Sequence, residues 1–138
     1  MPYELRSVTT LLQVYDMPTS IRFYRDLLGF TVINTSVPLG GHDRFHWAWL
    51  RRDQADVMLN TAYETDDERP ATPDSARVAA HDDTCLYFIS SNVDAAFEDL
   101  RHKLHSLQPP KVTFYGMKQL YLHDPDGYNL CLQAPAKP

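Results

Sequence analysis

Two cysteines carry the most reactive side chains of this sequence. Cys85 opens the run CLYFI and Cys131 lies within NLCLQ, so both occupy apolar segments that are typical of strands. Two thiolates hold zinc or copper(I) stably only when further ligands complete the site. We favour the alternative that both are small buried thiols beside a pocket, because free cysteine behaves as a small apolar residue.

The six histidines do not form a metal site by their spacing. His42 and His46 lie four apart, which in a strand separates them by roughly 13 Å, too far for one ion. His102 and His105 stand among basic residues, as on a solvated helix face. The sequence also has no Gly-x-Ser-x-Gly motif and no glycine-rich phosphate loop, which argues against the commonest nucleophilic and nucleotide chemistries.

Aromatic side chains give the positive signal for a ligand. Phe45, Trp47 and Trp49 alternate along one expected strand, so they share a face. Tryptophan and tyrosine bind flat, amphipathic molecules well, since each offers a large apolar face and one hydrogen-bond donor. Two alternatives stay open: the three rings would also suit an ordinary core strand, and Ala48 and Leu50 could line the pocket instead.

These residues lie in elements that occur twice in the same order: strand, helix, three strands. Helices are expected at residues 18–28, after the cap residue Asp16, and at 93–104, because both segments carry apolar stripes at helical spacing. The expected strands are residues 8–14, 30–37, 45–51, 56–62, 85–90, 112–115, 119–123 and 128–133.

We therefore predict a single domain made of a first module, residues 1–64, and a second module, residues 84–138. Residues 65–83 between them hold prolines, many acidic residues and no periodicity, and are interpreted as a solvated linker.

If helices cover one face of each sheet, that face must be apolar, and Leu12, Val14, Leu86 and Leu130 fit it. Asn60 would also point toward the helices. The opposite face then mixes polar and apolar residues, as in a concave ligand cavity. It is expected to hold Thr9, Leu11, Gln13, Val57, Leu59, Thr61, Cys85, Tyr87, Ile89, Tyr121, Asn129, Cys131 and Gln133.

Two stretches resemble a known family. VYD at residues 14–16 with SIRFYRDLLGF at 20–30 is similar to the opening of the vicinal oxygen chelate superfamily, and YLHDPDGYNL at 121–130 is similar to its closing signature. That superfamily contains glyoxalases, extradiol dioxygenases and bleomycin-resistance proteins. The resemblance implies an α+β fold of paired βαβββ modules that form incomplete barrels, and a homodimer. WLRRD at residues 49–53 resembles the metal-independent bleomycin-resistance branch.

Metal-using members of the superfamily hold their ion at four positions, which by resemblance fall here on Thr9, Leu59, Cys85 and Cys131. Leucine cannot ligate a metal and threonine is a poor ligand, whereas catalytic divalent ions need nitrogen or oxygen donors. We therefore expect no metal, no cofactor and no catalytic residue. The predicted ligand-binding residues are Thr9, Gln13, Trp47, Trp49, Leu59, Cys85, Tyr87, Tyr121 and Cys131.

The favoured function is metal-independent binding of a small molecule, either a drug or an aromatic metabolite. The alternative is a divalent-metal-dependent lyase or dioxygenase with an atypical site. Thirteen basic against eighteen acidic residues give a net charge of −5, which disfavours nucleic acid and membrane surfaces as partners. No export signal or apolar span is visible, so a cytoplasmic protein with free thiols is expected.

Overall fold

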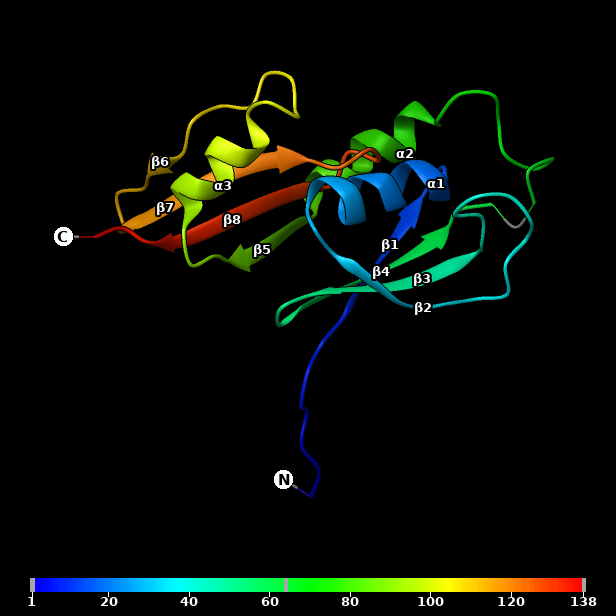
Figure 1. Cartoon of the computed structure of the whole chain (residues 1–138), viewed down its shortest axis with the longest axis horizontal. Helices are drawn as coiled ribbons and strands as arrows, with labels where there is room; N and C mark the ends of the chain where they lie inside the picture. The colour runs from blue at the N-terminus through cyan, green and yellow to red at the C-terminus, as the bar shows by residue number, and fades with distance from the viewer. Residues whose placement is uncertain (1, 64, 138) are drawn as a thin grey trace. The chain divides into compact units, whose positions relative to one another are not determined.

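The computed structural model describes residues 2–63 and 65–137. Two compact units, Met1–Arg69 and Pro70–Pro138, each contain one four-stranded mixed sheet with helices (Figure 1). The order strand, helix, three strands occurs in both units, so the predicted α+β fold of paired βαβββ modules is confirmed. The boundary between the units falls inside the stretch that was expected to be a linker.

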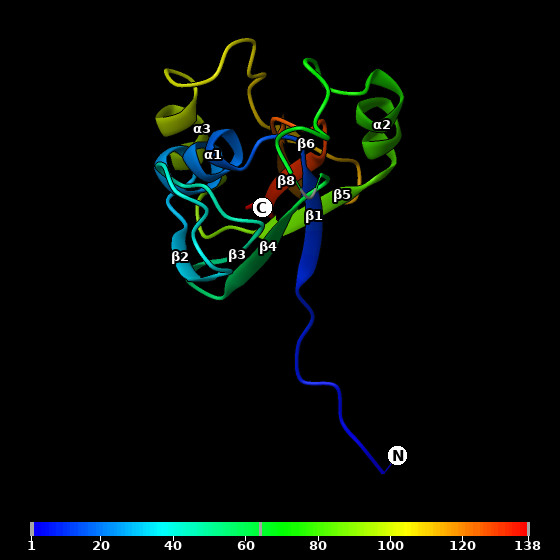
Figure 2. The same ribbon diagram turned by 90° about the vertical axis from the view of Figure 1, so that its right-hand side faces the viewer.

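In the first unit the strand order is β1-β4-β3-β2. β1 pairs with β4 in parallel, and the other neighbours are antiparallel. The elements are β1 (Thr10–Val14), α1 (Met17–Ile21), the π-helix η1 (Arg22–Leu27), β2 (Thr31–Thr35), β3 (Trp47–Arg52) and β4 (Ala55–Thr61). The exposed residues 2–8 extend away from this sheet (Figure 2).

The first helical run begins where the sequence predicts it. The carboxylate of Asp16 accepts a hydrogen bond from the backbone N–H of Thr19 at 3.2 Å, and Pro18 occupies the first turn. Ile21 and Tyr24, which belong to this helical run, are fully buried. The apolar stripe of residues 18–28 therefore packs on the sheet, as expected.

One face assignment in this sheet is wrong. The parallel register places Leu59 beside Leu12, and both Leu59 and Val57 are fully buried under the helices. Thr61 pairs with Val14 and shares that face, whereas Asn60 pairs with Gln13 on the other one. The reason is that residues 55–61 alternate an apolar set with a polar set, and the apolar set must cover the core.

The open question about the third strand is answered by the same pairing. Ala48 and Leu50 have no exposed surface and pair with Leu59 and Val57, so they belong to the core. Trp47 and Trp49 therefore lie on the opposite face of the sheet, which we call the first open face.

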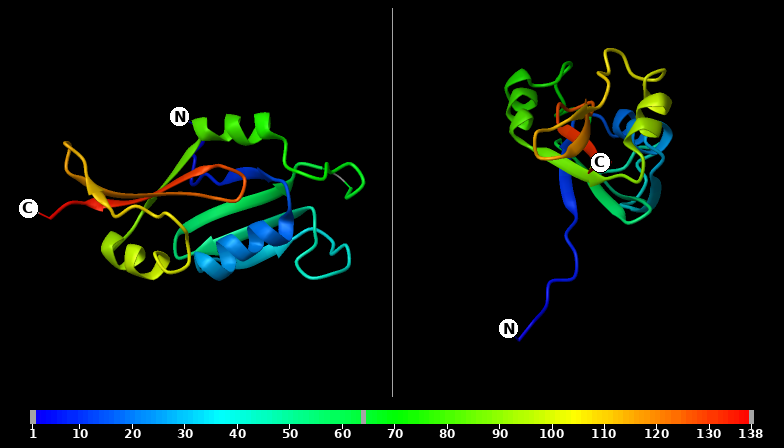
Figure 3. Two further views of the ribbon diagram at one scale, coloured as in Figure 1. Left: turned by 90° about the horizontal axis from the view of Figure 1, so that it is seen from above. Right: turned by 90° about the vertical axis from the view of Figure 1, so that its left-hand side faces the viewer.

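In the second unit the strand order is β5-β8-β7-β6, again with one parallel pair, β5 with β8. The helix α3 lies across one face of this sheet (Figure 3). The elements are α2 (Ser75–Ala80), the 3-10 helix η2 (His81–Asp83), β5 (Cys85–Ile89), α3 (Val93–Leu100), β6 (Lys111–Val112), β7 (Met117–His123) and β8 (Asn129–Pro135).

The face that α3 covers is the predicted one. Leu130 is fully buried, and Leu86 pairs with it on the same face and is half-buried. The side chain of Asn92 caps α3 by accepting from the N–H of Ala95 at 2.9 Å. The helix ends at Leu100, earlier than the predicted residue 104.

The segment expected to be an unstructured linker contains two helical segments, α2 and η2. They pack on the turn Asp124–Gly127: His81 stacks on Tyr128 at 3.9 Å, and its Nδ1 lies 2.7 Å from the Asp126 carbonyl oxygen. Neither segment has an apolar periodicity of its own, which explains why the sequence does not predict them. Asp124 Oδ1 accepts hydrogen bonds from the backbone N–H groups of Asp126 and Tyr128, each at 2.9 Å, so this carboxylate stabilises the turn.

Candidate functional site

A pair of hydrogen-bonded tyrosines stands on the face of the second sheet opposite α3, which we call the second open face. The hydroxyl oxygens of Tyr87 and Tyr121 lie 3.1 Å apart, and the two rings meet edge to face at 6.4 Å. Cys131 lies between them in the strand register and is fully buried. The two tyrosine side chains are 53% and 48% exposed, so their rings are available to a ligand.

The tyrosine pair continues into a polar network. The hydroxyl of Tyr121 donates to Gln119 Oε1 at 3.3 Å. Gln119 Nε2 in turn donates to Gln133 Oε1 at 3.0 Å and to the hydroxyl oxygen of Tyr115 at 3.2 Å. The second open face thus combines aromatic area with oriented donors and acceptors, the combination that small-molecule sites use.

Tyr121, Cys85 and Cys131 on this face are neutral side chains. The hydrogen bond with Tyr87, together with burial, raises the pKa of Tyr121 above its ordinary value, so its hydroxyl stays protonated at physiological pH. Burial likewise raises the pKa of the Cys85 thiol and of the Cys131 thiol. The face therefore offers hydroxyl and thiol groups and no fixed charge from these residues.

The first open face carries the tryptophans. Asn60 Nδ2 donates to Gln13 Oε1 at 3.5 Å, and Trp47 pairs with Asn60 in the register. Trp49 Nε1 donates to Asp56 at 3.1 Å, and the Arg51 guanidinium lies 5.2 Å from the ring centre of Trp49.

The negative charge of Asp56 on this face is balanced by an arginine. Arg51 Nε lies 2.8 Å from Asp56 Oδ1. The hydrogen bonds from Arg51 outweigh desolvation, and the Trp49 indole N–H adds to them, so the pKa of Asp56 is lowered.

A family model described as "Glyoxalase/Bleomycin resistance protein/Dioxygenase superfamily" matches residues 6–132. The chain belongs to this superfamily. The resemblance that the sequence motifs indicated is therefore confirmed. No curated protein matches the chain significantly.

Solved structures share the fold. TnmS3, an antibiotic binding protein from Streptomyces sp. CB03234, is 21% identical with a TM-score of 0.66, over 97% of this chain and 99% of that one. A glyoxalase/bleomycin resistance protein/dioxygenase from Nocardioides is 20% identical with a TM-score of 0.66, over 98% and 87%. Virulence protein STM3117 from Salmonella typhimurium is 24% identical with a TM-score of 0.60, over 95% and 97%. Similarities at this level of identity concern the fold alone.

The metal positions of the glyoxalase superfamily do not fit a divalent ion in this chain. Leu59 is an apolar core residue, Thr9 precedes β1, and the two cysteines supply soft donors whose thiols burial keeps protonated. Within residues 2–63 and 65–137, no three or more His, Cys, Asp or Glu side chains gather as a metal site requires.

The structure places the predicted ligand residues unequally. Leu59 is a wrong assignment, because it lies fully buried on the helix side of the first sheet. The other eight residues stay predictions as ligand contacts, and they divide between the two units: Thr9, Gln13, Trp47 and Trp49 in the first, and Cys85, Tyr87, Tyr121 and Cys131 in the second.

Sequence reasoning missed two polar members of these faces, Asn60 and Gln119. The signal for Gln119 was present, since it stands two residues before Tyr121 in one strand and so shares its face. Among the described residues, no helix has the length and apolar character needed to cross a membrane.

Proposed function

We propose that this protein binds an uncharged, flat small molecule of mixed apolar and polar character, such as a drug or an aromatic metabolite, without a metal. The observation that carries this proposal is the half-exposed pair Tyr87–Tyr121, hydrogen-bonded to a glutamine network on the second open face. Rings of this kind stack on a flat ligand, and their hydroxyl groups fix its orientation.

The charge of this face supports an uncharged ligand. Across β5, β8 and β7, the residues that share the face of Tyr87 and Tyr121 include no Lys, Arg, Asp or Glu; they are Met117, Gln119, His123, Asn129, Cys131, Gln133, Pro135, Cys85 and Ile89. On the edge strand β6, Lys111 pairs with Gln119 and adds one positive charge at the rim of this face. A charged group placed directly on the two tyrosines would therefore lose hydration without gaining an adjacent partner of opposite charge.

The first open face offers the same chemistry through Trp47, Trp49, Gln13 and Asn60. TnmS3, which has the same fold, is an antibiotic binding protein, and this supports a small-molecule binding role for the present chain. The lyase or dioxygenase alternative lacks support, since the donor set does not fit a divalent ion.

The test is a screen of aromatic metabolites and antibiotics by thermal shift, followed by calorimetry on the hits. Tyr121→Ala should weaken binding by about 1–3 kcal/mol, because it removes both a ring and a hydroxyl contact. Tyr121→Phe should lose only the hydroxyl contribution. Tyr3→Ala is the matched control, since Tyr3 is an exposed tyrosine outside both open faces.

Affinity for the hits should change little with salt, because no ion pair to the ligand is proposed. Equal affinity of the Tyr121→Ala and Tyr3→Ala variants for every hit would contradict the assignment of the second open face. Quenching of fluorescence reports separately whether Trp47 or Trp49 of the first unit contacts the ligand.

A further inference from the structure

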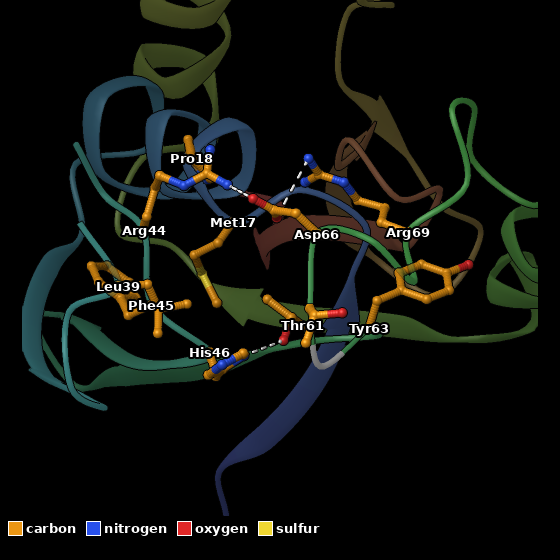
Figure 4. Close-up of a pocket in the computed structure, with 11 residues that line it drawn as sticks. Met17, Pro18, Leu39, Arg44, Phe45, His46, Thr61, Tyr63, Asp66 and Arg69 are labelled. Carbon is orange, nitrogen blue, oxygen red and sulfur yellow. Dashed lines mark hydrogen bonds and ion pairs between the residues drawn. The ribbon is translucent and has the colours of Figure 1, made fainter. Parts of the chain in front are cut away.

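The first unit contains a cavity of about 270 Å³ that none of the open-face residues lines (Figure 4). Its wall includes Met17 from the start of α1, Phe45 from the segment before β3, and Tyr63 from the segment after β4. These side chains are large and apolar over most of their surface. The cavity is partly open to solvent, and these three side chains give it an apolar wall.

The same cavity has a cationic rim. Two guanidinium groups, Arg44 and Arg69, line it together with the single carboxylate Asp66. Arg44 forms an ion pair with Asp66, and Arg69 Nη2 lies 3.7 Å from the other oxygen of Asp66. Figure 4 shows the Asp66 carboxylate between the two arginines. Two positive charges and one negative charge thus line the cavity, and Asp16, which lies outside the lining, pairs with Arg69 from behind.

Asp66 is the exposed partner of this arrangement. Its side chain is 63% exposed, against 37% for Arg44 and 25% for Arg69. Ion pairs at such exposure contribute about 0–1 kcal/mol, so a second carboxylate can displace Asp66 at small cost.

Both arginines are positioned by their surroundings. The Arg69 guanidinium lies 5.4 Å from the ring centre of Tyr15, and its Nη1 lies 2.7 Å from Asp16 Oδ1. A Cβ on Gly41 would lie 2.7 Å from the Cδ of Arg44, so the bare backbone of Gly41, at φ +84°, admits the Arg44 side chain. The Arg69 guanidinium is therefore held by contacts other than Asp66, and the Arg44 side chain has room to reach the cavity beside Gly41.

We propose that this cavity is a second ligand site, which binds a small organic carboxylate. The ligand carboxylate replaces Asp66 on Arg44 and Arg69, and the apolar body packs against Met17, Phe45 and Tyr63. Guanidinium groups bind carboxylates through paired hydrogen bonds, which favours a carboxylate over a single-point anion. The volume is below the usual range for drug-sized ligands, so a molecule with one ring or a short chain is expected.

The experiment titrates phenylacetate into the full-length protein and follows backbone amide shifts by NMR at low salt. Arg44→Gln should weaken binding about tenfold, because one fork of the anion site is lost. Asp66→Asn should strengthen it about threefold or more, because the competing carboxylate is gone. Phenylacetamide, the uncharged isostere, should not displace phenylacetate.

If Arg44 and Asp66 had only a structural role, their substitutions would not be expected to change phenylacetate affinity in opposite directions. Arg44→Lys is a second variant that keeps the positive charge but loses the forked guanidinium. It should bind phenylacetate less tightly than the wild type does. Tyr121→Ala should leave phenylacetate binding unchanged, so failure of this site and failure of the open-face proposal are distinguishable. The inference is overturned if phenylacetate shifts no residue of the cavity, or if Asp66→Asn weakens binding.

Discussion

Individual side chains show how strictly strand alternation separates roles in this molecule. In β4, Leu59 and Asn60 are adjacent in the chain, yet one is fully buried under the helices and the other bonds to Gln13 on the first open face. In the second unit, Cys131 fills space between Tyr87 and Tyr121, whose half-exposed rings and hydrogen-bonded hydroxyls face the other way from the core. A substitution here therefore affects either stability or ligand binding, depending on its face.

Leu59→Ala tests this separation. It should lower the free energy of unfolding by about 2–5 kcal/mol, since the truncation leaves a cavity in the core. Met58→Ala is the matched control, because Met58 is the preceding residue on the opposite face and is only half-buried. Urea unfolding measures both, and a larger loss for Met58→Ala than for Leu59→Ala would refute the face assignment.

At the scale of elements, short helices depend on single contacts at their ends. The α1 helix has five residues, so the cap at Asp16 and the packing on the sheet must stabilise it. The α2 helix has six residues, none of them buried, and rests on the Asp124–Gly127 turn through Val78. Each dependence can be measured.

Asp16→Ala should lower the free energy of unfolding at pH 7 by about 0.5–2 kcal/mol through loss of the α1 cap. Burial raises the pKa of Asp16, but its hydrogen bonds with Thr19 and the charge of Arg69 together outweigh burial and lower that pKa below the ordinary 3.8. Because the folded pKa is depressed, the stabilisation is fully present above pH 3.8 and is lost as pH falls through the folded pKa.

The measurement for Asp16 is urea unfolding of wild type and variant between pH 7 and pH 2. The two stabilities should converge at the acid end. Asp16→Asn is the control, since an amide oxygen still caps α1 while the charge opposite Arg69 is gone, and its stability at pH 7 should lie between the other two. A difference that stays constant with pH would exclude the carboxylate as the cause.

Gly127→Ala should destabilise the protein by more than Gly116→Ala, with a cost of about 1–3 kcal/mol from the strained backbone alone. Both glycines have positive φ, +86° and +87°. A Cβ at Gly127 would lie 2.9 Å from Val78 Cγ1, whereas one at Gly116 would meet nothing within 4 Å. Thermal unfolding compares the two variants, and equal losses would show that α2 does not pack firmly on the turn.

At the scale of the whole molecule, two properties follow from the side chains that the chain presents. Its described residues bring together no ligand set for a divalent ion, which concerns metal content. The described residues also expose large apolar side chains, which bears on whether two chains associate. These side chains are Tyr3, Leu5, Val8, Leu11, Ile33, Val37, Leu39, Tyr87, Ile89, Val112, Phe114, Tyr115 and Tyr121.

Metal analysis should find well under one ion of nickel, zinc, iron or manganese per chain. The reason is that Leu59 is apolar core and that Cys85 and Cys131 lack the further ligands a stable site needs. The measurement is elemental analysis of protein purified without an affinity tag. Stoichiometric metal that disappears in Cys85→Ser or Cys131→Ser would favour the enzyme alternative.

Sedimentation at micromolar concentration should report a homodimer, with twice the 15.9 kDa mass of the chain. Exposed apolar side chains such as the fully exposed Phe114 are costly in a lone subunit, and a second copy is the commonest way to cover them. A single species at the mass of one chain would contradict this expectation.

The sequence alone determined the order of elements, the helix that follows Asp16, the turn at Asp124–Gly127 and the faces of the second sheet. These features depend on residues close together in the chain: a cap, a fixed proline, a glycine with positive φ, and strict alternation. Such local patterns favour a single backbone conformation. The superfamily motifs are made of patterns of this kind.

Tertiary structure decided the rest. Leu59 belongs to the core because β4 pairs in parallel with β1, and that register joins residues far apart in the sequence. The helices α2 and η2 form because they pack on a turn some forty-five residues later, as the contact of His81 with Asp126 shows. The cavity between Arg44 and Arg69 likewise has no local signature, since only folding brings its separate loops together.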